Sequence, residues 1–355
     1  MPSPERTLVI RHRAAGDLLL TTPALRALRA GIPGASIDVL VAAGMEELLE
    51  GNPDVDRVLA FDRKSVASQA ALYARLARGG YRRVVDLVSN PRSAILSALT
   101  RAPVRAGYDI PGRAWAYTVR VPREPLGADG RPVLRYAPEA ALDVVRALGI
   151  SAQGVALEFR AGARAYKRID AWLGKRRDEF GPRPVVACLP TGSWPAKTWI
   201  AERFATAMDA LAEEAAIVWI WGPGEEETVA AVRARMARPS WMAPPTGWQE
   251  LGALLARSAL LVTNDSGPKH VAVAVGTPTV TIYGPTHPRT WHPPAGPHAV
   301  VEATGLDCLH CNANRCPLEG ARHHRCMRDV GVERVVDASR TLLRAAEREA
   351  PCAGR

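Results

Sequence analysis

The sequence predicts an α/β protein of two domains, each a doubly wound parallel sheet covered by helices. Short apolar runs rich in β-branched residues alternate with helical patterns along the chain, which is typical of parallel sheets with helices on both faces. The alternation loosens at residues 151–184, where charge and glycine are frequent, and then begins again. With 355 residues, the chain is long enough to build two such cores.

Turn and cap signals divide the chain into these elements. In the first half we expect strands at residues 7–11, 37–41, 58–61, 83–87, 104–106 and 119–121, and helices at 22–30, 92–99 and 138–148. In the second half we expect strands at residues 185–189, 217–221, 260–262 and 279–283, and helices at 201–212, 226–236 and 267–275. The stretch 151–184 is expected to be a linker with one crossing helix. The resulting domains span residues 1–160 and 161–331, followed by a C-terminal helix and tail at 332–355.

The composition and charge of the chain indicate which classes of protein it can belong to. The formal net charge is +10, and only five of the 46 basic residues are lysines. Because the arginines are scattered rather than clustered, the charge favours anionic partners other than nucleic acid, and phosphate, sugar-acid and lipid-headgroup substrates are all compatible with it. The N-terminal residues do not resemble a signal peptide, and no apolar run approaches the length of a bilayer span. We therefore expect a cytoplasmic protein without nucleic-acid partners.

A polar turn at residues 264–270 lies between two apolar strand patterns, in the segment "LLVTNDSGPKHVAVAVGTPTVTIYGPT". Gly267 is expected to cap the following helix, Pro268 to open it, and Gly276 to end it in a left-handed conformation. This places Asp265 and Ser266 at the carboxyl end of a strand, beside a helix N-terminus that favours an anion. The alternative is that these two residues only cap the helix.

Three further turns follow strands. Gly16-Asp17 follows the first strand, and Asp17 is either a turn residue or a functional carboxylate. The loop "LPTGSWPAKTW", residues 189–199, offers hydroxyls and the cation of Lys197 to phosphate oxygens, or is an ordinary surface loop. In "WGPGEEE", residues 221–227, Glu225 lies where doubly wound folds often bind a ribose hydroxyl, although acidic residues also suit a helix N-terminus.

Taken together and in order, these motifs resemble those of glycosyltransferase family 9, the ADP-heptose:lipopolysaccharide heptosyltransferases. The resemblance rests on "TLVIRHRAAGDLLLTTPALRAL", "LPTGSWPAKTW", "WGPGE", "NDSGPKHVAVAVGTPTVTIYGPT" and the later "CLHC", and it runs from about residue 7 to residue 336. It implies a GT-B architecture, with two Rossmann-like domains facing across a cleft. The first domain would bind the acceptor, and the second would bind the nucleotide sugar.

The resemblance also implies roles for single residues. Asp17 matches the catalytic aspartate of the family, Lys197 a lysine that contacts the diphosphate, and Glu225 or its neighbour Glu226 a ribose contact. The remaining donor-binding residues implied are Thr191, Gly192, Asp265, Ser266, Gly267 and His270. Inverting transfer needs a base for the acceptor hydroxyl and positive charge for the departing diphosphate, which these residues would supply.

The partners implied are an ADP-sugar donor and an anionic glycolipid or other glycan acceptor, with peripheral association of the enzyme with the inner face of the cytoplasmic membrane. Lys269, next to His270, is either a second phosphate ligand or a solvated helix residue, and we favour the latter. Other readings stay open: an enzyme of the same family acting on a protein or small-molecule acceptor, a nucleotide-sugar epimerase, or a non-catalytic nucleotide-sugar-binding protein.

Two patterns suggest metal ions. Asp54-Val55-Asp56 has the spacing of metal-dependent glycosyltransferases, but it follows Asn-Pro in a turn that accounts for both aspartates. We expect catalysis without a cofactor. The cysteines Cys308, Cys311, Cys316 and Cys326 either form a structural zinc or iron site or are reduced thiols that pack a loop.

Overall fold

The structure is a computed structural model that describes residues 5–349. The chain divides after Arg160 into two compact units, Met1–Arg160 and Ala161–Arg355, which are described separately. The tail expected after the C-terminal helix, residues 350–355, lies outside the described residues. Within residues 5–349, none of the helices is both long enough and apolar enough to cross a membrane.

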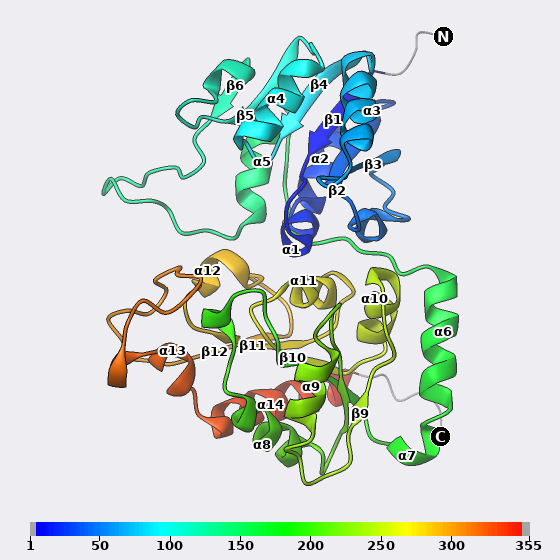
Figure 1. The fold of residues 1–355 in the computed structure, drawn as a ribbon, viewed down its shortest axis with the longest axis vertical. Coiled ribbons are helices and arrows are strands. Elements are labelled where there is room, and N and C mark those ends of the chain that lie inside the picture. The colour runs from blue at the N-terminus through cyan, green and yellow to red at the C-terminus, as the bar shows by residue number, and fades with distance from the viewer. Residues whose placement is uncertain (1–4, 350–355) are drawn as a thin grey trace. The chain divides into compact units, whose positions relative to one another are not determined.

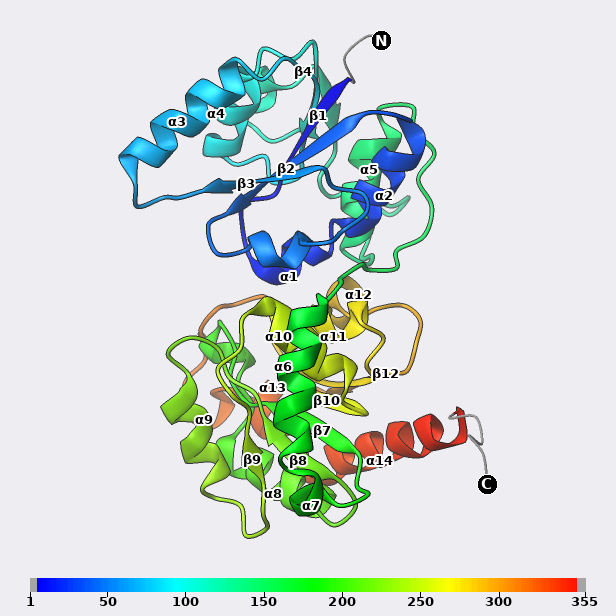
Figure 2. The same ribbon diagram turned by 90° about the vertical axis from the view of Figure 1, so that its right-hand side faces the viewer.

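Unit 1 contains a six-stranded parallel sheet with strand order β3-β2-β1-β4-β5-β6 (Figure 1). The strands are β1 (Arg6–Ile10), β2 (Ser36–Ala42), β3 (Arg57–Phe61), β4 (Tyr81–Asp86), β5 (Val104–Tyr108) and β6 (Val119–Val121). The helices are α1 (Ala15–Leu19), α2 (Thr22–Gly31), α3 (Val66–Ala77), α4 (Pro91–Leu99) and α5 (Pro138–Arg146), with 3₁₀ turns η1 (Glu46–Leu49) and η2 (Ala114–Ala116). Helix α2 packs beside α5 on one face, and α3 packs beside α4 on the other (Figure 2).

Unit 2 repeats this architecture with strand order β12-β11-β10-β7-β8-β9, again all parallel. The strands are β7 (Val185–Leu189), β8 (Ala216–Trp219), β9 (Trp241–Met242), β10 (Leu260–Asn264), β11 (Thr279–Tyr283) and β12 (His298–Glu302). The helices are α6 (Ala163–Gly174), α7 (Arg177–Phe180), α8 (Ala201–Leu211), α9 (Glu226–Arg233), α10 (Trp248–Ala256), α11 (Gly267–Ala274), α12 (Pro288–Trp291), α13 (Arg325–Arg328) and α14 (Val332–Glu349), with 3₁₀ turns η3 (Pro195–Lys197) and η4 (Gly320–Arg322).

In both sheets the strand order reverses direction at the centre, between β1 and β4 in unit 1 and between β10 and β7 in unit 2. In doubly wound sheets, ligands bind outside the carboxyl ends of the strands at such a switch point. The residues that follow β1, β4, β7 and β10 are therefore the first place to look for function.

The predicted fold class is confirmed, and β7 and β11 have the predicted bounds. The loose stretch before β7 holds two helices, α6 and α7, where one was expected. Helix α11 is capped by Ser266 rather than Gly267, while Gly276 ends it with a φ of +81°, as expected. The helices α1, α3 and α10 and the strand β12 were not predicted.

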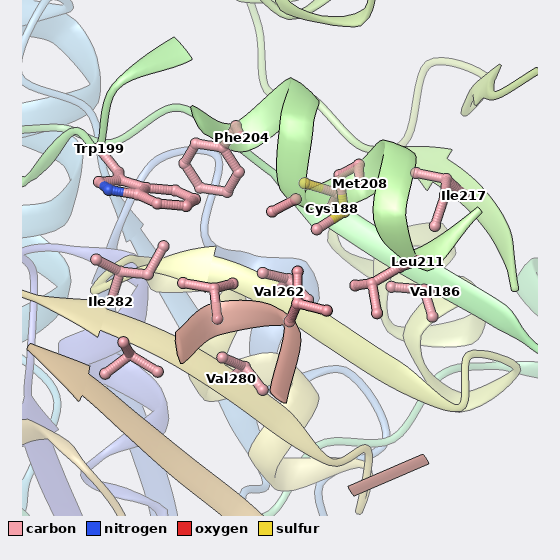
Figure 3. Close-up of a cluster of buried hydrophobic side chains, with 14 of the residues drawn as sticks. Val186, Cys188, Trp199, Phe204, Met208, Leu211, Ile217, Val262, Val280 and Ile282 are labelled. Atoms are coloured by element: carbon pink, nitrogen blue, oxygen red, sulfur yellow. The ribbon is translucent and has the colours of Figure 1, made fainter. Parts of the chain in front are cut away.

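A large hydrophobic core of unit 2 lies between its sheet and helices α8, α9, α13 and α14, and part of it is drawn in Figure 3. Side chains of β7, β10 and β11 face Phe204 and Met208 of α8 in this core. Trp199 and Phe204 meet edge to face, with ring centroids 5.0 Å apart. Trp199 is the last residue of the loop that carries Lys197, so this contact anchors the end of that loop in the core.

Because Phe204 is fully buried, Phe204→Ala should destabilise the protein by about 3–5 kcal/mol through lost burial and the cavity left behind. Chemical denaturation measures this change. Lys167→Ala, at an exposed position of α6 in the same unit, is the control and should change stability by no more than about 0.5 kcal/mol. Equal effects of the two substitutions would contradict the packing described for this core.

Candidate functional site

Asp17 lies in α1, directly after β1, at the switch point of unit 1. It is in a short helix rather than the open turn that was expected. Its carboxylate forms an ion pair with Arg11, with Oδ2 3.0 Å from Nη2. Arg11 also donates to the backbone carbonyl of Leu87 at the end of β4, so the pair bridges the two central strands. The side chain of Asp17 keeps 26% of its surface exposed and is open to a ligand.

A cavity of about 550 Å³ opens beside Asp17 within unit 1. Its walls come from the segments that follow β1, β4, β5 and β6. The lining residues are Arg11, Arg13, Ala14, Asp17, Val88, Ser89, Asn90, Ile110, Arg113 and Arg123. Four guanidinium groups around one carboxylate make this cavity suited to an anionic ligand that also presents a group for the carboxylate.

Two lining residues are held in the left-handed region, which non-glycine residues rarely adopt. Ala14 has a φ of 48° and Ser89 a φ of 50°. Ser89 is fixed there because its N–H donates to the buried Asp86 carboxylate and its hydroxyl accepts from the N–H of Tyr108, at 2.9 and 2.8 Å. Local strain of this kind is retained where the surrounding structure imposes it, often at functional sites.

In unit 2, Asn264 holds the loop 190–199 against the end of β10. Its side-chain oxygen accepts from the N–H of Trp199 at 3.0 Å, and its amide donates to the carbonyl of Pro190 at 2.8 Å. Asn264 is fully buried. Sequence reasoning gave this residue no role, although a polar side chain at the end of an otherwise apolar strand was a usable signal.

The structure brings the predicted Thr191 and Glu225 together. The hydroxyl of Thr191 donates to Glu225 Oε2 at 2.9 Å, and the N–H of Gly222 donates to the same oxygen at 2.9 Å. Glu225 precedes α9 and does not cap it through its side chain. Gly192 follows Thr191 in the same loop, and a Cβ added there would make only ordinary contacts.

Asp265 is the centre of a charged cluster at the start of α11. Its Oδ2 accepts from Lys197 Nζ at 2.9 Å and from the Thr286 hydroxyl at 2.8 Å, and its Oδ1 accepts from Lys269. Burial alone would raise the pKa of Asp265, but the ammonium groups of Lys269 and Lys197 hold it below its usual range. Asp265 is therefore a buried carboxylate that organises two cations.

The expectation that Lys269 is a solvated helix residue is wrong. Its side chain is fully buried and bonds Asp265, the Tyr283 hydroxyl and the Trp291 carbonyl, the last two at 2.9 Å. A buried ammonium needs such partners because desolvation disfavours its charge. Lys269 stands four residues after Asp265, which puts both on one side of a helical turn.

The other predicted residues of this segment also lie at the start of α11. Ser266 caps the helix by position, and its hydroxyl lies 3.2 Å from that of Thr263 rather than bonding a helix N–H. Gly267 is the first helical residue, so its N–H and those that follow point out of the helix end. Burial lowers the pKa of His270 well below its usual range, and the nearby Lys269 lowers it further. His270 is therefore neutral at physiological pH.

Asp54 and Asp56 are used by the fold of unit 1. Asp56 accepts from the N–H of Ile37 and from Arg29, each at 2.6 Å, and Asp54 is buried in the turn held by Asn52. Asp54 therefore lies in the expected turn, whereas the carboxylate of Asp56 joins β2 and α2.

The four cysteines of residues 308–326 are neighbours in unit 2. Burial raises the pKa of Cys326 to about 11, and the thiols of Cys311, Cys308 and Cys316 raise it as well. The N–H of His324 lies 3.2 Å from Cys316 Sγ, the type of N–H···S contact that tunes metal-bound thiolates. Nevertheless, within the part of the chain that the structure describes, no three His, Cys, Asp or Glu side chains stand close enough to hold a metal ion together. The donor set suits zinc or iron, and the metal site stays a prediction.

Comparison with known proteins gives the family of this chain. The sequence profile of glycosyltransferase family 9 (heptosyltransferase) matches residues 69–322. The chain belongs to this family. It is 27% identical over 293 residues to lipopolysaccharide heptosyltransferase 3 of Escherichia coli, covering 79% of this chain and 84% of that protein. The chain is thus a glycosyltransferase with heptosyltransferase relatives.

Solved structures of the same family share the fold of this glycosyltransferase. The family 9 glycosyltransferase of Veillonella parvula superposes with a TM-score of 0.82 at 24% identity, covering 97% of this chain and 99% of that one. The ADP-heptose lipopolysaccharide heptosyltransferase II of E. coli superposes with a TM-score of 0.75 at 21% identity, covering 96% and 99%. The α/β fold with two doubly wound parallel sheets, expected from the sequence, is confirmed by these neighbours.

If the four cysteines bind a structural metal, the protein purified without chelators should hold zinc or iron near one equivalent, because thiolate sites couple metal affinity to local folding. Elemental analysis measures the ion. Cys308→Ser with Cys311→Ser should lose it, whereas Cys188→Ala, which removes a thiol of strand β7, should retain it. A metal-free wild-type protein in which all four thiols react with a thiol reagent would contradict the prediction.

Proposed function

We propose that this glycosyltransferase transfers a heptose from an ADP-heptose to a hydroxyl of an anionic acceptor, the core of a lipopolysaccharide, with inversion at the anomeric carbon. The observation that carries the proposal is the cavity of unit 1, where Asp17 stands among four arginines. A base and a set of anion-binding groups in one cavity are what a charged glycan acceptor needs. The heptosyltransferase relatives support the choice of sugar.

The donor is assigned to unit 2. Lys197 and the N-terminus of α11 offer positive charge to a diphosphate, since the first N–H groups of a helix are unpaired and its dipole favours an anion. Thr191 and Glu225 lie together after β7 and β8, where a ribose hydroxyl binds in doubly wound folds. The solved E. coli relative is named for ADP-heptose, which supports ADP as the nucleotide.

The proposed reaction is a single displacement. The acceptor oxygen attacks the anomeric carbon of the heptose while the bond from that carbon to the β-phosphate oxygen breaks. Asp17 takes the proton of the acceptor hydroxyl, and ADP leaves with the electron pair of the broken bond. Lys197 stabilises the negative charge that develops on the departing diphosphate. Attack opposite to the leaving group inverts the anomeric configuration.

Asp17→Asn should lower turnover by about two to four orders of magnitude, because the amide cannot accept the proton. The affinity for ADP-heptose should stay nearly unchanged, since Asp17 is assigned to the acceptor. The release of ADP from ADP-heptose, measured with heptose-free and heptose-containing core oligosaccharides as acceptors, gives the rate, and calorimetry gives the donor affinity. Asp129→Asn, at an exposed position of unit 1, is the matched control and should retain activity. Near-normal turnover of Asp17→Asn would remove Asp17 from the mechanism.

Because the diphosphate charge is assigned to Lys197 and the helix N-terminus, we propose that transfer needs no divalent ion. Treatment with EDTA should leave the initial rate intact, measured as ADP release in the same assay. A rate that falls at once on chelation and returns with magnesium or manganese would show that an ion bridges the diphosphate. In that case Asp54 and Asp56 would have to be reconsidered as ligands.

A further inference from the structure

A fully buried lysine lies behind the lysine assigned to the diphosphate, and the proposed reaction gives it no role. The Lys269 side chain is 0% exposed, whereas that of Lys197 keeps 13% of its surface exposed. Both ammonium groups bond the carboxylate of Asp265, one at each oxygen. Only Lys197 therefore has surface left to offer a ligand.

The charges of this cluster do not cancel. Two ammonium groups share one carboxylate, so the cluster carries one net positive charge while all three groups are ionised. If the ammonium of Lys269 were absent, the carboxylate of Asp265 and the ammonium of Lys197 would form a neutral ion pair. The attraction of Lys197 for a phosphate would then be opposed by a carboxylate 2.9 Å from its ammonium group.

The surroundings of Lys269 hold it in this place. The Tyr283 hydroxyl and the Trp291 carbonyl, each 2.9 Å from Nζ, accept its remaining hydrogen bonds, and the ammonium lies 5.1 Å from the centroid of the Tyr283 ring. On the other side of Asp265, the ammonium of Lys197 lies 4.5 Å from the centroid of the Trp194 ring. Because the cluster is buried, salt screens these charges much less than it screens surface charges.

We propose that Lys269 is a positioning residue that neutralises Asp265 and so leaves the charge of Lys197 available to the donor's diphosphate. The inference rests on the proposed function, because it takes Lys197 as the phosphate contact. Lys269 itself does not touch the donor. It acts through Asp265, which also keeps Lys197 in place.

Lys269→Met tests this charge role, since methionine is similar in length and uncharged. The affinity for ADP should weaken by about tenfold or more because Lys197 becomes paired with an otherwise unopposed carboxylate. The affinity for adenosine, which lacks the diphosphate, should stay the same. Calorimetry with both ligands gives the preference for ADP over adenosine, and thermal unfolding records stability separately. An unchanged preference would overturn the inference, even if the variant is less stable.

A second variant restores the charge balance without restoring the lysine. Asp265→Asn combined with Lys269→Met removes one charge of each sign and leaves Lys197 as the cation of the cluster. Its preference for ADP should recover from that of Lys269→Met toward the wild-type value. If Lys269 serves packing alone, the double variant will be no better than the single one, which would overturn the inference. The double variant removes both of the most deeply buried charges, those of Asp265 and Lys269, so it also provides the test if the single variant does not fold.

Two further variants separate this inference from the proposed function. Tyr283→Phe removes a hydroxyl bonded to Lys269 but keeps every charge of the cluster, so the preference for ADP should not change. Lys197→Ala should abolish most of that preference. If Lys197→Ala has no effect, the donor site itself is wrong and the inference falls with it. If Lys197→Ala lowers the preference but Lys269→Met does not, the inference alone is overturned.

Discussion

The carboxylate of Asp265 is the interaction on which the organisation of the unit 2 site depends. It lies between β10 and α11 and joins three segments of the chain, through Lys197, Lys269 and Thr286. A carboxylate in this position would be costly to bury alone, and each of its partners would be costly to bury without it. The loop after β7, the start of α11 and the segment after β11 are thus held in one arrangement by a single side chain.

Asn264, the residue before Asp265, holds the backbone of the loop 190–199 in place. It fixes both ends of the loop 190–199 by bonding Pro190 and Trp199, while Asp265 holds Lys197 between them. The loop is therefore ordered by side chains at the end of β10 together with its own 3₁₀ turn η3. In unit 1 the ion pair of Arg11 and Asp17 has a comparable place, since it connects the segments after β1 and β4.

The sequence was informative wherever local chemistry decides the structure. Buried parallel strands can be recognised as short β-branched runs. A proline marks the start of α2 and of α11, and Gly276 marks the end of α11. Helix α10 was missed because its "LGALLA" stretch is apolar on all sides, and such a stretch has no amphipathic period. Strand β12 is short and follows the proline-rich turn at residues 293–297, which hid it.

The residues of the candidate site could be proposed from the sequence, whereas the contacts that they make in the structure could not. Its residues follow the strand ends, where the fold class places ligands. The burial of Lys269 was not predictable, because it depends on Tyr283 and Trp291, which reach it only after β11 has joined the sheet. The i, i+4 spacing from Asp265 was the one local hint. The hydrogen bonds of Asn264 to Trp199 and Pro190 are likewise non-local, because each joins residues more than 60 positions apart in the sequence.

The arginines around Asp17 come from separate connections of unit 1 rather than from its strands. Arg11 and Arg13 follow β1, Arg113 follows β5, and Arg123 follows β6. Substitutions in such connections disturb the packed core little, because loops tolerate change far better than buried strands do. The pattern of arginines in this cavity can therefore change residue by residue while Asp17 and the sheet stay as they are.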